Sequence, residues 1–166
     1  MAENYDLIAD LSGNGSSGTI DIQSIPQTYK ALYITFMYTT TSTSITYLKM
    51  SLTSSGTSDY GFIILGGKNN TVYPDNYGGT RYPAQITSDQ GGYANEYYSV
   101  GGEIFIPDYT NTYSQSWHAS HGTRFYNASS HSTGTKKSGG AVINMKLFLS
   151  AGGFTSDSRI RVYGLV

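Results

Sequence analysis

Near its C-terminus the chain reads Ile143-Asn-Met-Lys-Leu-Phe-Leu-Ser150, then Ala151-Gly-Gly-Phe-Thr-Ser-Asp-Ser158, then Arg159-Ile-Arg-Val-Tyr-Gly-Leu165. Apolar and polar residues alternate in the first and third segments. Successive strand side chains point to opposite faces, so the pattern predicts two half-buried strands joined by a glycine-containing loop. A terminal strand this apolar needs strands on both flanks and a sheet beneath it, which the earlier sequence must supply.

A helix over Ala141–Ala151 is the alternative, because Val142, Met145 and Leu149 are also helically spaced. We favour a strand, since the segment is short, glycines flank it, and Asn144 would lie inside the helix.

The composition favours strands and turns throughout. Only 13% of the 166 residues are charged, while the chain contains 16 Tyr and 20 Gly. Ser, Thr, Tyr, Asn and Gly are typical of strands and turns, and few windows hold good helix formers. We therefore expect one all-β domain over residues 1–166, built as an antiparallel β-sandwich.

Short alternating or apolar runs, bounded by turn residues, indicate further strands. The expected strands are Tyr5–Leu11, Thr19–Ile22, Lys30–Tyr38, Tyr47–Thr53, Tyr60–Leu65, Pro83–Thr87, Val100–Ile106, Tyr113–His121 and Thr123–Asn127, the last two as a bent strand or a tight pair. Lys30–Tyr38 is apolar on both faces, which is typical of a central strand covered on each side. Nine or ten short strands without a fixed repeat favour a jelly-roll-like sandwich.

Long polar loops with many tyrosines are expected between some strands. The segment Lys68–Tyr98 combines Tyr with Asn, Gly and Asp, a composition typical of contact surfaces. Some of these tyrosines could equally cap one end of the sandwich. Trp117 is expected in the core, and joins the contact surface if exposed. The candidate contact surface is Tyr73, Tyr77, Tyr82, Tyr93, Tyr97, Tyr98 and Trp117.

No catalytic, metal or cofactor motif is apparent. His118 and His121 lie three apart, so on a strand they face opposite sides and cannot share an ion. His131 and the Lys136-Lys137 pair fall in a polar segment, Ala128–Gly140, expected as a solvated loop. The carboxylates are scattered singly at predicted turns. We therefore expect no enzyme activity, no metal and no cofactor.

The net charge and the hydropathy of the chain restrict the classes of partner that we expect. Ten basic and 11 acidic residues leave almost no net charge, which argues against nucleic acid. No apolar run approaches the length of a spanning helix, and Met-Ala-Glu-Asn-Tyr-Asp6 shows no secretory signal. Without cysteine, disulfides and thiolate chemistry are excluded. We expect synthesis in the cytosol, with no membrane partner.

Three segments in roughly the C-terminal 40% of the chain carry a resemblance to a known group of proteins. Gly102-Glu-Ile-Phe-Ile-Pro-Asp-Tyr109 precedes Ala141-Val-Ile-Asn-Met-Lys-Leu-Phe-Leu-Ser-Ala-Gly-Gly-Phe154 and Ser158-Arg-Ile-Arg-Val-Tyr-Gly-Leu165. This order resembles small jelly-roll virion structural proteins of tailed bacteriophages, in which a terminal Leu-Tyr-Gly-Ile-like strand follows a Gly-x-Phe loop. The chain departs at Val162-Tyr163-Gly164-Leu165, and the resemblance covers roughly its C-terminal 40%.

The resemblance implies a non-enzymatic virion subunit made in bacterial host cytoplasm. Because a major capsid protein is normally much longer, it implies a decoration or cement protein that stabilises the head, commonly as a homotrimer, with the major capsid protein or another virion protein as partner. The alternative is a carbohydrate- or receptor-binding module on the tail, where Trp117 and the loop tyrosines would stack on glycan rings.

Overall fold

The computed structural model describes residues 4–44, 46–52, 60–68, 71–81, 84–87, 98–123, 128–137 and 139–166. Within these ranges the chain forms β-strands and no helix. The strands are β1 (Tyr5–Ser12), β2 (Thr19–Ile22), β3 (Ala31–Tyr38), β4 (Leu48–Ser51), β5 (Tyr60–Lys68), β6 (Thr71–Arg81), β7 (Ala84–Gln85), β8 (Val100–Pro107), β9 (Gln115–Thr123), β10 (Ala128–Lys136), β11 (Met145–Leu149) and β12 (Arg159–Leu165).

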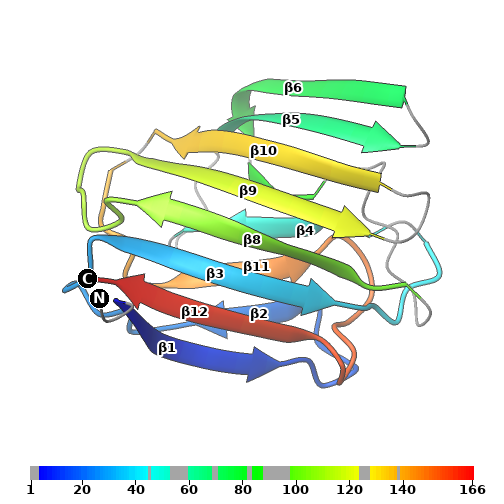
Figure 1. The fold of residues 1–166 in the computed structure, drawn as a ribbon, viewed down its shortest axis with the longest axis horizontal. Helices are drawn as coiled ribbons and strands as arrows, with labels where there is room; N and C mark the ends of the chain where they lie inside the picture. Colours follow the sequence, from blue (N-terminus) through cyan, green and yellow to red (C-terminus); the bar gives the residue numbers. More distant parts are fainter. Residues whose placement is uncertain are drawn as a thin grey trace.

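The strands form two antiparallel sheets packed face to face (Figure 1). The larger sheet has eight strands in the order β1-β12-β3-β8-β9-β10-β5-β6, and the smaller has four in the order β2-β11-β4-β7. The expected all-β antiparallel sandwich is therefore confirmed.

The topology is that of a jelly roll enlarged by two hairpins. Four pairings are nested along the chain: β1 with β12, β2 with β11, β3 with β8, and β4 with β7. Alternate pairs lie in opposite sheets, as they do when one long hairpin is rolled up. The β5–β6 and β9–β10 hairpins are inserted between these strands and lengthen the larger sheet beyond β8.

The C-terminal segment forms strands, and the helix alternative is wrong. β12 lies between β1 and β3, with Val162 opposite both Ala9 and Ile34. β11 belongs to the other sheet, so the intervening loop crosses from one sheet to the other. β11 begins only at Met145, and Ile143 is 53% exposed.

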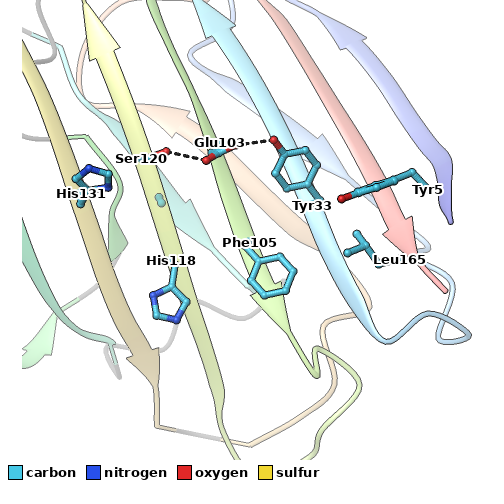
Figure 2. A pocket seen from close by; sticks show the side chains of 9 residues that line it. Tyr5, Tyr33, Glu103, Phe105, His118, Ser120, His131 and Leu165 are labelled. Atoms are coloured by element: carbon cyan, nitrogen blue, oxygen red, sulfur yellow. Dashed lines mark hydrogen bonds between the residues drawn. The ribbon is translucent and has the colours of Figure 1, made fainter. Parts of the chain in front are cut away.

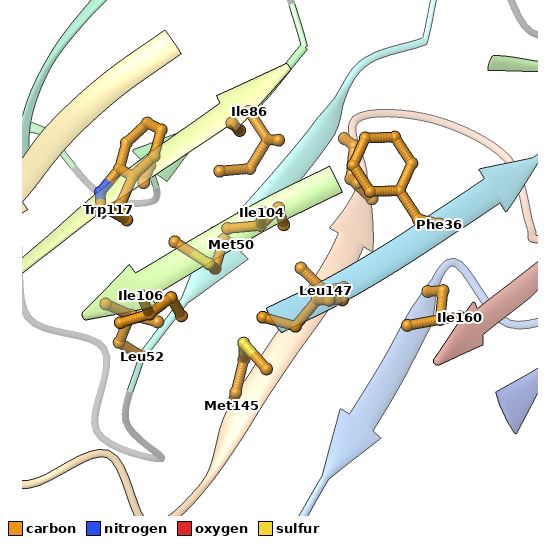
Figure 3. Close-up of a cluster of buried hydrophobic side chains, with 14 of the residues drawn as sticks. Phe36, Met50, Leu52, Ile86, Ile104, Ile106, Trp117, Met145, Leu147 and Ile160 are labelled. Carbon is orange, nitrogen blue, oxygen red and sulfur yellow. The ribbon is translucent and has the colours of Figure 1, made fainter. Parts of the chain in front are cut away.

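The core fills the space between the sheets (Figure 3). Alternate side chains of β3 and β12 point inward and are buried, and so are those of β4 and β11. Trp117 is fully buried from β9 and packs with its ring tilted against Phe62 on β5. The prediction that Trp117 belongs to the core is confirmed.

Two predicted loops contain strands. Ala128–Gly140 was expected as a solvated loop, but Ala128–Lys136 is β10, and Lys136 is buried. The inward hydroxyl of Ser132 donates to Ile86 O at 2.9 Å. A strand can therefore bury small hydroxyl residues when its neighbours accept their hydrogen bonds, a condition that local periodicity does not report.

The predicted Lys68–Tyr98 loop was wrong where it overlaps β6, whereas β7 lies within the predicted strand Pro83–Thr87, which is confirmed. The two segments expected around Gly122 form one continuous strand, β9, as far as Thr123. The end of the second segment, residues 124–127, lies outside the described residues.

β3 is central, as predicted, but it is covered on one side only. Leu32 and Ile34 are fully buried against the small sheet. On the opposite side, Tyr33 and Thr35 are half-buried and Met37 is exposed. The larger sheet therefore has an outer face with apolar and aromatic residues that no other described part of the chain covers.

Neighbouring glycines on β8 provide a test of this two-sided packing. A Cβ on the inward Gly102 would lie 2.6 Å from the Phe36 ring and 2.3 Å from Ser120 O, whereas one on the outward Gly101 would meet only Phe36 O, at 3.8 Å. We expect Gly102→Ala to lower the free energy of unfolding by about 1–3 kcal/mol through overpacking. Urea denaturation followed by circular dichroism measures it.

Gly101→Ala is the matched control. Its new methyl group enters open space and reduces the freedom of the unfolded chain, so its effect is expected to be neutral or slightly stabilising. Equal losses in the two variants would contradict the assignment of inner and outer faces.

Candidate functional site

The register of the larger sheet lines up its outward side chains in rows across the strands. One row runs through Tyr163, Tyr33, Phe105, His118, Thr133 and Ile63. The next runs through Arg161, Thr35, Glu103, Ser120, His131 and Leu65. By contrast, the outward face of the smaller sheet carries the Lys146–Asp21 ion pair, at 3.2 Å.

A groove crosses the middle of this outer face (Figure 2). It consists of two adjoining depressions of about 350 and 490 Å³, which share Tyr33, Glu103, Ser120 and His131 among their lining residues. Tyr5, Phe105 and His118 line the first, and Gly101 and Gly122 the second. We call this feature the outer groove. Its size is in the range of small-molecule sites.

Glu103 lies at the centre of the outer groove and is held by two hydroxyl groups. Tyr33 donates to Glu103 Oε2 at 2.5 Å, and Ser120 donates to Oε1 at 2.9 Å (Figure 2). These bonds, that of Tyr33 first, lower the pKa of the Glu103 carboxyl. The same bond raises the pKa of Tyr33 to about 12, so its hydroxyl stays a donor at neutral pH.

Three tyrosine rings support one another at one end of the groove. The ring of Tyr5 meets that of Tyr33 edge-on at 5.9 Å and that of Tyr163 at 6.4 Å, while the Tyr33 and Tyr163 rings lie 6.3 Å apart. Edge-to-face contacts of this kind stabilise aromatic clusters and restrict their motion. Tyr5 nevertheless remains 51% exposed, so part of its ring faces solvent.

A buried imidazole lies on the other side of the sheet from the groove centre. His121 is almost fully buried on the inner face of β9, and Ser130 Oγ lies 3.0 Å from its ring nitrogens. Burial, reinforced by the charge of nearby His131, lowers the pKa of His121 to about 4. His118 is exposed on the outer face, so the prediction that these two histidines point apart is confirmed.

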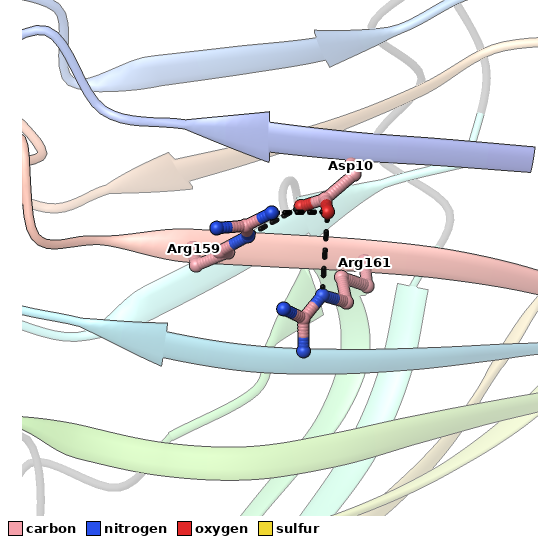
Figure 4. A network of polar contacts seen from close by, with 3 residues as sticks. All are labelled: Asp10, Arg159 and Arg161. Atoms are coloured by element: carbon pink, nitrogen blue, oxygen red, sulfur yellow. Dashed lines mark hydrogen bonds and ion pairs between the residues drawn. The ribbon is translucent and has the colours of Figure 1, made fainter. Parts of the chain in front are cut away.

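An ion cluster fixes the edge strand beside the tyrosines (Figure 4). Arg159 Nε donates to Asp10 Oδ1 at 2.6 Å, and Arg161 Nε to Oδ2 at 3.4 Å. The Arg159 guanidinium also pairs with Oδ2, and its bonds lower the pKa of Asp10. Exposed pairs of this kind add little stability, so the cluster mainly aligns β1 with β12.

The opposite end of the outer face is aliphatic. Ile63 and Leu65 on β5 are 51% and 52% exposed, and Val72 on β6 is 66% exposed. Val72 is paired with Gly67 of β5, which lies two residues after Leu65 and four after Ile63. The side chain of Val72 therefore lies on the same face of the sheet as those of Ile63 and Leu65. We call these three residues the outer aliphatic patch. Clustered exposed aliphatic residues are typical of interaction surfaces.

None of the described residues that line the outer groove belongs to the sequence-predicted contact surface. Trp117 is buried and cannot contribute to an exposed surface, whereas Tyr98 is half-buried beside β8. Tyr73 and Tyr77 belong to β6, and only their backbone is described. Tyr82, Tyr93 and Tyr97 lie outside the described residues. For the tyrosines of Lys68–Tyr98, the amino-acid composition of the segment remains the only basis for the predicted contact surface.

The residues that line the groove were not singled out from the sequence. Tyr33 did have a signal: it belongs to the run Lys30–Tyr38, whose two faces are both apolar. His131 was assigned to a loop, yet it lies on β10 and lines the groove. Glu103 and Ser120 come from different strands, and only the register of β8 with β9 brings them together.

The described residues contain no group of three or more His, Cys, Asp or Glu side chains placed to hold a metal ion. Nor does any helix in the described ranges have the length and apolar character needed to cross a membrane.

Comparisons with known proteins identify no family. No family model and no curated protein matches the chain. Among solved structures, the exo-inulinase from Aspergillus awamori shares 10% identity, with a TM-score of 0.42 over 98% of this chain and 29% of that one. The VP2 subviral particle of infectious bursal disease virus shares 14%, with a TM-score of 0.14 over 98% and 40%. The chain thus spans less than half of either protein, and likenesses this low carry no argument.

The buried His121 predicts a specific loss of stability in acid. Below about pH 6.5 an unfolded histidine binds a proton, while the folded one stays neutral down to about pH 4. The free energy of unfolding should therefore fall over that window by on the order of 3 kcal/mol and level off below it. Urea denaturation at a series of pH values measures the loss.

His121→Gln keeps a polar side chain for Ser130 but does not titrate, so the fall between pH 6.5 and 4 should shrink by that amount. His118→Gln is the matched control, because it leaves His121 and Ser130 in place and should retain the part of the fall that His121 causes. A slope unchanged in His121→Gln would refute the linkage.

The Glu103 network predicts a second titration result. Because the Tyr33 hydroxyl is the main cause of the lowered pKa, Tyr33→Phe should raise the pKa of the Glu103 carboxyl, and Ser120→Ala should raise it less. Carbon-detected NMR titration of the glutamate carboxyls reports both. Tyr163→Phe is the control, since that neighbouring ring makes no described bond to Glu103.

Proposed function

We propose that the chain is a non-enzymatic structural subunit of a tailed-phage virion, a decoration or cement protein that stabilises the head. The observation that carries the proposal is the outer aliphatic patch of Ile63, Leu65 and Val72. Exposed aliphatic side chains on adjacent strands favour burial against another protein, at roughly 25 cal/mol for each Å² covered.

The form of the larger sheet supports this role. The outer aliphatic patch lies on its outer face, whereas its inner face packs against the smaller sheet and forms the core. Binding a partner at the patch therefore requires no rearrangement of the core. The jelly roll also agrees with the resemblance of the C-terminal segments to phage virion proteins. A homotrimer is the assembly we propose, with the major capsid protein or another virion protein as the partner.

The test is binding to the parent virion. Labelled recombinant chain is mixed with purified parent particles stripped of it, and the bound fraction is measured by co-sedimentation. Replacing both Ile63 and Leu65 by Ser should reduce binding at least tenfold, because two aliphatic side chains lose their burial. Light scattering of the free protein measures whether it is a trimer.

Ile143→Ser is the matched control, because Ile143 is equally exposed, at 53%, but lies outside the patch. It should bind the particle like the wild type. Both proteins should retain the wild-type melting temperature. Failure of the wild type to bind stripped particles, or equal binding by the patch variant, would refute the proposal.

A further inference from the structure

Glu103 presents unused acceptor capacity in a fixed orientation. An ionised carboxylate offers about four lone-pair positions. Tyr33 occupies one on Oε2 and Ser120 one on Oε1, which leaves an acceptor position on each oxygen. The side chain is exposed at the centre of the outer groove. Two neighbouring hydroxyl groups on one ligand ring match this pair of acceptors.

The aromatic rings offer a complementary surface beside the carboxylate. Tyr5 and Tyr33 line the same depression as Glu103, and their mutual ring contacts hold them in place before a ligand arrives. A rigid aromatic ring gives contact area at low entropic cost and attracts C–H groups through dispersion and weak C–H contacts. A ring with an apolar C–H face and a hydroxyl rim fits both features.

The remaining groups provide hydrogen bonds and room. His118 and His131 line the groove, and a neutral imidazole both donates and accepts. Gly101 and Gly122 lie opposite each other on β8 and β9, so part of the second depression has only backbone beneath it. The groove draws on six neighbouring strands, β1, β12, β3, β8, β9 and β10, which extend about 24 Å at a spacing of about 4.8 Å. That is longer than a single sugar ring.

The charges in and around the outer groove disfavour anionic ligands. The Glu103 carboxylate at the centre repels phosphate and other anions, and Arg159 and Arg161 are paired with Asp10. An organic ammonium would find the carboxylate and the rings attractive. However, His131 lies in the same groove, and its charge acts on Glu103 in competition with that of a ligand cation.

We propose that the outer groove binds a saccharide chain, with Glu103 accepting bonds from a pair of sugar hydroxyls and Tyr5 and Tyr33 contacting the ring face. The inference goes beyond the proposed virion role and uses residues other than the outer aliphatic patch. It does not depend on Trp117 or on Tyr73–Tyr98.

The test applies the full chain to an array of printed bacterial surface polysaccharides and defined neutral oligosaccharides, followed by calorimetry with the best binder. Glu103→Gln removes the charge but keeps the shape, and should weaken binding at least tenfold. Gly101→Tyr places a side chain into the second depression, where a Cβ meets only Phe36 O, at 3.8 Å, and should block it. Tyr113→Ala is the control, because Tyr113 is highly exposed but lies outside the groove.

Saccharide binding that both groove variants lose and Tyr113→Ala retains supports the inference, and loss in Glu103→Gln alone suffices if Gly101→Tyr does not fold. No binding to any printed saccharide, binding unaffected by Glu103→Gln, or binding of choline chloride in place of saccharides would overturn it. Co-sedimentation of Glu103→Gln with stripped particles separates the two roles, since only the patch variant should lose particle binding.

Discussion

The pairing of β12 between β1 and β3 is the constraint on which the larger sheet depends. The strand brings the end of the chain beside its beginning, with Leu165 opposite Tyr5 on one side and Ala31 on the other. The pairing of β1 with β12 is the outermost of four nested pairings. The inner three are β2 with β11, β3 with β8 and β4 with β7. Because the contacts of the outermost pairing join residues far apart in the chain, loop-closure entropy opposes their formation, and burial of the alternate side chains must offset it.

The same pairing positions the outer groove. Tyr5 on β1 reaches Tyr33 on β3 across β12, whose Tyr163 completes the cluster. The bonds of Arg159 and Arg161 to Asp10 hold β1 in the register that this contact needs. A groove made from six separate strands is thus as rigid as the sheet itself, and rigidity of this kind would lower the entropic cost of binding a ligand.

The sequence predicted those strands whose inward residues are large and apolar. Lys30–Tyr38 and Val100–Ile106 were located to within a residue because large apolar side chains occupy most of their inward positions. The sequence did not predict β10, because its inward positions include Ser130 and Ser132, whose hydroxyls bond to His121 and to Ile86 O. Such a strand is stabilised by neighbours distant in the sequence, so a local pattern cannot reveal it.

The candidate site was harder to predict for a related reason. No local sequence pattern distinguishes Glu103, Ser120 or Tyr33. Their hydrogen-bond network forms only because β3, β8 and β9 pair in this register. One signal was available, namely the two apolar faces of Lys30–Tyr38. The inference of cover on both sides was wrong for this chain by itself, since Met37 is 46% exposed. Read together with the structure, that pattern indicates a face suited to a partner or ligand.

The period of two separates core-forming side chains from outward side chains along the described strands of the larger sheet. On β8, Ile104 is buried in the core while its neighbours Glu103 and Phe105 face the groove. A slip of one residue in register would exchange the two sets, so the apolar inner row fixes the outer row without contacting any ligand. Outward positions are therefore free to vary in chemistry, which allows one sheet face to carry an aliphatic edge and a polar, aromatic groove. The inner glycine Gly102 shows the limit of that freedom, because the Phe36 ring occupies the space where its side chain would lie.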